Sequence, residues 1–230
     1  MKSLLLSISF FLCINYFAFS QNFIHGIALD TPSGMEYFKY DLDNGGFSSL
    51  SIPGYFSVIP GMSTYNHSED LFIFCAFNSE IVLNTNTLSI DTILPLPSRG
   101  FIRGLESKDS MIYHFISDSV DHFFETFNVN TGKRQILDSM TGFLLFQQGG
   151  STFDYDNDRL ILTGPGSLWA VDVNTGQFAD TIFTGGSVTQ LIEYYNGSYY
   201  GFVNDVFDQY LYKIDDINKT YDTLGLVPGT

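Results

Sequence analysis

The densest group of potential metal ligands in this 230-residue sequence is the acidic run Asp154-Tyr155-Asp156-Asn157-Asp158. Several carboxylate and amide oxygens on one short loop are ligands that Ca²⁺ prefers. An EF-hand loop also needs Gly at its sixth position and Glu at its twelfth, where this chain has Arg159 and Pro165. We therefore interpret the run as a turn between two strands, in which Asp and Asn side chains bond the local backbone. A weak Ca²⁺ site is the alternative.

No other group of residues in the sequence matches a catalytic or metal-binding pattern. The four histidines lack metal-ligand spacing, and the chain has neither an HExxH motif nor paired CxxC motifs. They are His25, His67, His114 and His122. A GxSxG nucleophile elbow is also absent, so nothing selects a Ser-His-Asp triad. We predict no catalytic residue, no metal site and no cofactor.

The charge balance limits the classes of partner. The chain has 25 Asp and Glu against 10 Lys and Arg, which gives a net charge of −15. This balance excludes nucleic acid, because binding phosphates requires clustered basic residues. It also opposes docking on an anionic membrane. Carboxylate pairs suited to glycoside cleavage arise by chance in such a chain, so we interpret the acidic excess as a solubilising surface.

The first twenty residues have the layout of a secretory signal peptide. Met1-Lys2 gives a positive start, an apolar run follows, and Ala18-Phe19-Ser20 places small residues at the −3 and −1 positions. We predict cleavage after Ser20 and a protein that is secreted, periplasmic or on the cell surface. An uncleaved membrane anchor is the alternative. Cleavage would leave residues 21–230 as one domain without a membrane span, with Cys75 as its remaining cysteine.

A repeated hairpin organises the rest of the chain. Five segments share an alternating apolar strand, a turn rich in Asp, Asn, Thr and Gly, and a second strand. The first polar residues of the turns are Asp41, Asn84, Asn128, Asp172 and Asp216, with separations of 43, 44, 44 and 44. In the triplets 130–132 and 174–176, Asn-Thr-Gly places Gly where a hairpin turn needs positive φ.

Between these hairpins lies a second pair of strands in each repeat, for example the segments FDYDNDRLIL and IEYYNGSYYGF. Apolar residues alternate along the strands, with Trp169, Val171 and Val173 on one side and Ala170 and Asp172 on the other. Four strands in about 44 residues is typical of a β-propeller blade. We predict an all-β β-propeller of four-stranded blades with about five repeats. An immunoglobulin-like sandwich is the alternative, but it does not require a constant period.

The hairpins LWAVDVNTGQ (168–177) and TFNVNTGKR (126–134), with the strand entry YDNDRLIL (155–162), resemble bacterial secreted β-propeller repeat proteins of the YVTN and quinoprotein-like type. The resemblance covers residues 23–227 and implies a fold rather than an activity, because propellers serve both enzymes and binding proteins. The chain has Trp169 as its sole tryptophan. The tryptophan-docked blades of quinoprotein dehydrogenases are therefore excluded, and with them the argument for a quinone cofactor.

The 210 residues after the predicted cleavage site correspond to about 4.8 repeats. Two interpretations follow: a compact five-bladed ring with one short blade, which we favour, or part of a six- to eight-bladed protein. An incomplete ring would leave an unpaired edge. We expect a monomer.

Propeller ligands usually bind on the loops at one end of the blades. The candidate loops are Ser117 to His122, Val203 to Gln209 and Pro95 to Arg103. The last loop contains Arg99 and Arg103, two of the four arginines, which form either a clamp for an anionic ligand or ordinary salt bridges.

A triplet of Asp, then Ser or Thr, then an apolar residue recurs in the sequence. It begins at Asp91, Asp109, Asp118, Asp138, Asp180 and Asp222. The triplet resembles an O-glycosylation sequon of exported Gram-negative proteins, and ordinary strand alternation is the alternative.

Taken together, these patterns favour an exported, non-enzymatic binding or interaction module whose ligand is an unknown protein or glycan. A carbohydrate-active hydrolase or lyase that uses channel-facing acidic residues is the alternative.

Overall fold

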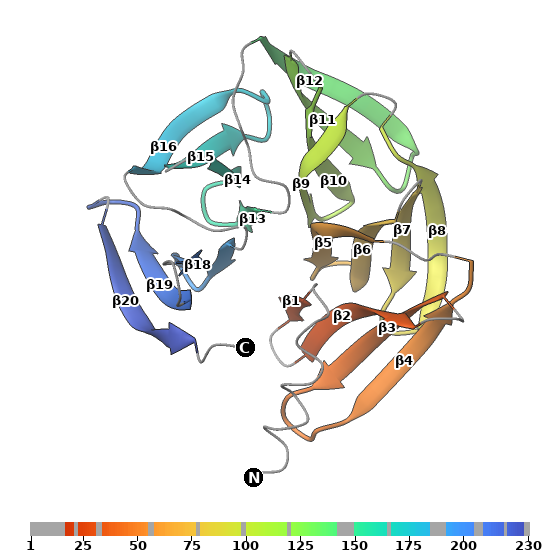
Figure 1. The fold of residues 1–230 in the computed structure, drawn as a ribbon. Coiled ribbons are helices and arrows are strands. Elements are labelled where there is room, and N and C mark those ends of the chain that lie inside the picture. Colours follow the sequence, from red (N-terminus) through yellow and green to blue (C-terminus); the bar gives the residue numbers. More distant parts are fainter. Residues whose placement is uncertain are drawn as a thin grey trace. The chain divides into compact units, whose positions relative to one another are not determined.

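The computed structural model describes residues 17–20, 23–30, 34–54, 58–76, 79–97, 100–118, 121–141, 150–164, 167–184, 192–204, 209–218 and 220–227. Every regular element in these residues is a β-strand, and the strands form five antiparallel sheets of four (Figure 1). In each sheet the strands follow one another in chain order. The described residues contain no helix with the length and hydropathy needed to cross a bilayer.

The chain divides into two compact units, Met1–Leu96 with Thr230, and Pro97–Gly229. The first unit holds blade 1, formed by β1 (Phe17–Ser20), β2 (Phe23–Asp30), β3 (Gly34–Asp41) and β4 (Phe47–Ile52). It also holds blade 2, formed by β5 (Val58–Asn66), β6 (Leu71–Ala76), β7 (Ser79–Asn84) and β8 (Ser89–Pro95).

The second unit holds three blades. Blade 3 consists of β9 (Phe101–Lys108), β10 (Met111–Ser117), β11 (Asp121–Asn128) and β12 (Lys133–Thr141). Blade 4 consists of β13 (Ser151–Asp154), β14 (Arg159–Gly164), β15 (Ser167–Asp172) and β16 (Phe178–Thr184). Blade 5 consists of β17 (Ile192–Tyr195), β18 (Ser198–Asn204), β19 (Gln209–Asp215) and β20 (Thr220–Val227). The predicted all-β propeller of about five four-stranded repeats is confirmed, and separate four-stranded sheets exclude the sandwich.

Strand β1 lies within the predicted signal peptide. It pairs with β2 over four positions, from Phe17 opposite Gly26 to Ser20 opposite Phe23. Cleavage after Ser20 would therefore remove the first strand of blade 1 and leave β2 to β4.

The turn between the third and fourth strands of each blade is held by one side chain. In every blade, the Oδ1 atom of an Asp or Asn accepts the backbone N–H groups two and three positions later. These residues are Asp41, Asn84, Asn128, Asp172 and Asp215. The sequence marker Asp216 is therefore wrong by one position, and the last separation is 43 rather than 44. Gly132 and Gly176 have the predicted positive φ, at 67° and 76°.

The turn between the first and second strands has two lengths. In blades 2 and 4 it has four residues, 67–70 and 155–158, and in blades 3 and 5 it has two, 109–110 and 196–197. The longer turns begin after Asn66 and Asp154, whose Oδ1 atoms accept the same pair of backbone N–H groups. Both longer turns end in an Asp with positive φ, Asp70 at 54° and Asp158 at 52°.

Three apolar cores formed by the described residues lie between adjacent blades of one unit. In the first unit, Tyr37 of blade 1 packs with Phe72 and Phe74 of blade 2, and all three side chains are at most 2% exposed. In the second unit, Phe115 and Phe124 of blade 3 pack against blade 4. The opposite face of blade 4 joins Ile192, Tyr199 and Ile214 of blade 5 in a third cluster. The predicted alternation is confirmed, because Trp169, Val171 and Val173 belong to one cluster and Ala170 to the other.

Candidate functional site

The acidic run at 154–158 forms the four-residue turn between β13 and β14, as the turn interpretation predicts. Asp154 is fully buried, and its Oδ1 accepts the N–H groups of Asp156 and Asn157 at 3.2 and 3.1 Å. Its Oδ2 accepts the Nδ2–H of Asn157 at 2.9 Å and the Nε–H of Arg159 at 2.7 Å. The carboxylate therefore holds both the turn and the first residue of the next strand.

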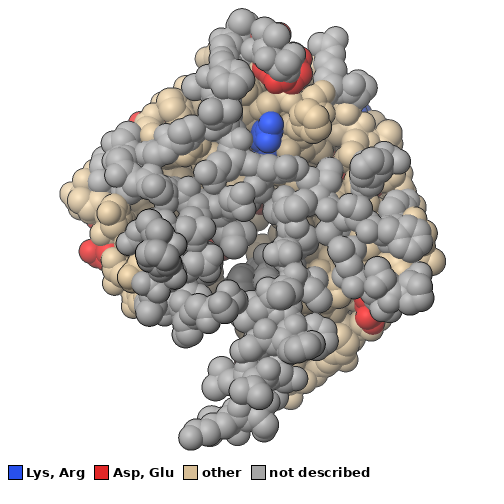
Figure 2. Space-filling model, in the orientation of Figure 1, with Lys and Arg blue, Asp and Glu red and all other residues tan. Residues whose placement is uncertain are grey.

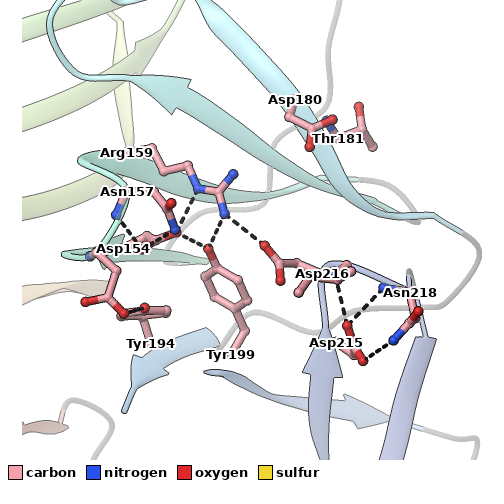
Figure 3. Close-up of polar contacts among 12 residues, drawn as sticks. Asp154, Asn157, Arg159, Asp180, Thr181, Tyr194, Tyr199, Asp215, Asp216 and Asn218 are labelled. Atoms are coloured by element: carbon pink, nitrogen blue, oxygen red, sulfur yellow. Dashed lines mark hydrogen bonds and ion pairs between the residues drawn. The ribbon is translucent and has the colours of Figure 1, made fainter. Parts of the chain in front are cut away.

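The same carboxylate reaches blade 5. The hydroxyl of Tyr199, on β18, donates to Asp154 Oδ2, and Arg159 Nη2 donates to the Tyr199 hydroxyl oxygen at 3.0 Å (Figure 3). Arg159 Nη2 also lies 2.9 Å from Oδ2 of Asp216. Burial alone would raise the pKa of Asp154, but the hydrogen bonds from Tyr199, Arg159 and Asn157 outweigh it and leave the pKa below its usual value.

The other two aspartates of the run also contact neighbouring blades. Asp158 pairs with Lys108 of blade 3, and Asp156 accepts the hydroxyl of Tyr194 of blade 5. The three carboxylates of the run thus point to different partners rather than to one shared point. Among the described residues, no three His, Cys, Asp or Glu side chains are placed to hold a metal ion. We conclude that this run joins blades, a role that its sequence alone did not indicate.

Two histidines of the first unit lie at the contact between blades 1 and 2. His25 on β2 is fully buried, and its Nδ1 is 2.7 Å from the Tyr37 hydroxyl. Its ring stacks on Tyr65 with centroids 4.3 Å apart, and Tyr65 in turn meets His67 edge-on. Burial lowers the pKa of His25 to about 4, so the imidazole is neutral near pH 7.

The two histidines of the second unit lie on neighbouring strands with separate partners. His122 on β11 has its Nδ1 2.7 Å from the Ser117 hydroxyl. His114 on β10 has its Nδ1 3.6 Å from Oε1 of Glu125, and Glu125 also pairs with Arg134. The described contacts give these histidines a role inside blade 3.

Glu193 stands apart from the other carboxylates. It lies on β17, the first strand of blade 5, and its side chain is exposed. The surrounding protein still desolvates the carboxylate and raises its pKa to about 7. Because water reaches the side chain, solvent screening offsets part of this effect. A carboxyl group with a pKa near neutrality is suited to general acid or base chemistry.

Arg103 and Phe101 lie at the start of β9, the first strand of blade 3. Phe115 of β10 pairs with Gly104 and Ile116 pairs with Ile102, so Arg103 is the extra residue of a β-bulge. Its guanidinium carbon lies 5.8 Å from the centre of the Phe101 ring, and that ring is 69% exposed.

The structure brings two of the predicted ligand loops to one end of blade 3. Phe101, from the 95–103 loop, pairs with Ser117, and Ser117 pairs with His122, so both loops meet on one ladder. Arg99 and residues 119–120 lie outside the described residues, as do residues 205–208 of the third candidate loop. Of the two arginines in the predicted clamp, the structure therefore describes Arg103 alone. On the face drawn in Figure 2, described charged side chains appear as separate spots rather than as a continuous patch.

Four of the six Asp-Ser/Thr-apolar triplets lie on the outer strands β8, β12, β16 and β20, beginning at Asp91, Asp138, Asp180 and Asp222. Each of these strands contains a register shift at or beside its triplet. Asp138 and Asp180 accept the N–H of the next residue at 2.8 and 2.7 Å, which satisfies a backbone donor at the sheet edge. Glycosylation stays a prediction.

No known family model matches this sequence. No curated protein matches it either. The fold does match solved structures. A nidogen/laminin complex aligns with a TM-score of 0.70 and 15% identity over 91% of this chain and 79% of the other. TolB from Acinetobacter baumannii aligns with a TM-score of 0.68 and 14% identity, over 94% of this chain and 55% of TolB.

An oligogalacturonate lyase in complex with manganese aligns with a TM-score of 0.56 and 11% identity, over 90% of this chain and 62% of the lyase. At these identities the likeness concerns the fold. Together with the five four-stranded sheets, it places the chain in the class of β-propellers.

Proposed function

We propose that this chain is an exported β-propeller that works as a non-enzymatic binding module for a protein or glycan ligand. The observation that supports this proposal most directly is the set of partners to which the acidic side chains are bonded. The five turn caps and the three aspartates of the 154–158 run are engaged with the backbone or with neighbouring blades. They stabilise a platform rather than converge on a reaction centre.

A propeller can serve either binding or catalysis, and similar folds illustrate both, a complex of two proteins and a lyase. One observation favours an enzyme as the second candidate. Glu193 is exposed on a first strand and has a pKa raised to about 7, which would suit a general acid in a carbohydrate-active hydrolase or lyase.

A substrate screen with a matched variant separates the two functions. The purified exported chain is incubated with a panel of neutral and acidic oligosaccharides, and products are followed by mass spectrometry. The binding module predicts no products. Turnover that survives repurification and falls at least about a hundredfold in Glu193→Gln, as expected for loss of a general acid, would establish the enzyme instead. Glu69→Gln, an exposed carboxylate in the turn after β5, is the control.

Export is tested separately. Expression with the natural N-terminus in a Gram-negative host, followed by mass spectrometry of periplasm and medium, should give a chain that begins at Gln21. An intact chain that stays in the cytoplasm would contradict the proposed export.

A further inference from the structure

We propose that Phe101 and Arg103 form a binding subsite for an isolated sugar carboxylate, so that the ligand is a glycan carrying a uronic acid. This inference rests on the proposed binding function and names its ligand class. Both residues lie at the start of β9. The ring of Phe101 is largely exposed, and Arg103 pairs with no carboxylate of the described residues.

The first observation is which of the arginines pair with carboxylates. Three of them lie in the described residues, and two are committed to carboxylates. Arg134 pairs with Glu125, and Arg159 pairs with Asp154 and Asp216. Arg103 lies beside the ring of Phe101, and no carboxylate of the described residues pairs with it. A partly buried guanidinium without an anion is ready to accept one.

The second observation is the backbone under Arg103. In a regular strand, Arg103 would follow the alternation of β9, but the bulge between the pairs of Phe115 and Ile116 re-aims its side chain. Gly100, with φ of 64°, allows the backbone just before β9 to pass close to the backbone of Ser117. A Cβ atom there would lie 2.3 Å from the Ser117 carbonyl oxygen. Both features fix where the start of β9 presents its side chains.

The third observation is the exposed ring beside the cation. A Phe ring that is 69% exposed forgoes most of the free energy that its burial would provide. The electron-rich face of an aromatic ring attracts the polarised C–H groups on one face of a sugar. An arginine fork next to such a ring can hold a carboxylate on the same sugar through two parallel hydrogen bonds.

The net charge of −15 further limits the classes of ligand that the chain can bind. A polyanionic chain or a strongly acidic protein would be repelled at long range, whereas a neutral glycan with one carboxylate would be repelled little. We therefore select a uronic acid attached to a neutral oligosaccharide.

The test compares glucuronosyl-xylotriose with xylotriose, which differ in the carboxylate-bearing sugar. Affinities are measured by calorimetry, and saturation-transfer NMR identifies the sugar that touches the protein. Arg103→Gln should weaken binding of the glucuronosyl probe about tenfold or more and leave xylotriose unchanged. Lys133→Gln removes the same charge from an exposed position on β12 and should have no effect.

A second pair of variants tests the ring. Phe101→Ser should weaken both probes, while Phe47→Ser, which removes a ring of similar exposure at 64% on β4, should weaken neither. Circular dichroism checks that each variant is folded. Absence of binding by the unmodified chain, or equal affinity of Arg103→Gln and Lys133→Gln, would overturn the subsite and leave the binding-module function standing. Release of xylotriose from bound probe would instead overturn the non-enzymatic function, with the subsite intact.

Discussion

Arg159 on β14 and Asp216, in the turn after β19, form an ion pair with 2.9 Å between Nη2 and Oδ2 that joins blade 4 to blade 5. The same guanidinium donates its Nε–H to Asp154 within blade 4. One arginine therefore neutralises two carboxylates, one of them fully buried. Because Tyr199 donates to the same buried oxygen, the four side chains form one connected polar junction.

Removing the arginine should destabilise the second unit strongly. Arg159→Met keeps most of the side-chain volume but leaves Asp154 buried without its cation, and we expect a loss of about 3 kcal/mol in the free energy of unfolding. Urea titration followed by circular dichroism measures it. Lys133→Met, which removes an exposed cation, should change stability by less than about 0.5 kcal/mol. Equal losses in both variants would contradict the junction.

His25 should make the chain less stable as the pH falls toward 4. Its pKa is lowered to about 4 in the folded chain, against 6.5 unfolded, so the unfolded chain binds the additional proton between these values. We expect about 3 kcal/mol of stability present above pH 6.5 to be lost as the pH falls to 4. Urea titrations at several pH values measure the slope. His25→Gln should flatten it, and a slope unchanged by that substitution would refute the assignment.

Glu193 should have the opposite effect to His25 on the pH dependence of folding stability. Its folded pKa of about 7 exceeds the unfolded value of 4.5, so the folded chain binds the extra proton between these values. This contribution to stability is complete below pH 4.5 and is lost as the pH rises through 7. Glu193→Gln, which mimics the protonated form, should equal the parent chain at pH 4.5 and exceed its stability at pH 8. A carboxyl carbon that titrates near pH 4.5 by NMR would contradict this prediction.

Gly150 should not tolerate a side chain. A Cβ atom there would lie 1.6 Å from Oγ1 of Thr163, whose N–H donates to the Gly150 carbonyl oxygen at 2.7 Å. Gly150→Ala must therefore displace β14 or its own segment, and we expect a loss of about 3 kcal/mol or more, measured as a fall in thermal midpoint. Gly225→Ala, where the Cβ meets nothing within 4 Å, is the matched control and should be nearly neutral.

Local chemistry made the fold predictable from sequence. The Asn-Thr-Gly turns indicated two hairpins, because Gly adopts the φ of 67° and 76° found at Gly132 and Gly176 without the steric cost of a side chain. The alternation around Trp169 and Ala170 assigned the two faces of blade 4 correctly. Both signals lie within a few residues of the structure that they specify.

The contacts of the candidate site depend on which residues of different blades meet and on strand register. Local sequence signals do not contain this information. Asp215 and Asp216 are equally suited to cap a turn, and only the geometry shows that the first does so while the second pairs with Arg159. Tyr199 lies 45 positions beyond Asp154, one repeat along, so the repeat length could have suggested that contact. The bulge that re-aims Arg103 is a register shift, which alternation cannot reveal.

From blade 2 to blade 5 the two turn lengths alternate, so that matching features recur in blades 2 and 4. Asn66 and Asp154 are 88 positions apart, as are Asp70 and Asp158, whereas blades 3 and 5 have the shorter turn. The turns of blades 2 and 4 share their length, a capping Asn or Asp side chain and a final Asp with positive φ. The turn 155–158, transplanted onto 67–70, should therefore be accepted more readily than in place of the two-residue turns 109–110 or 196–197.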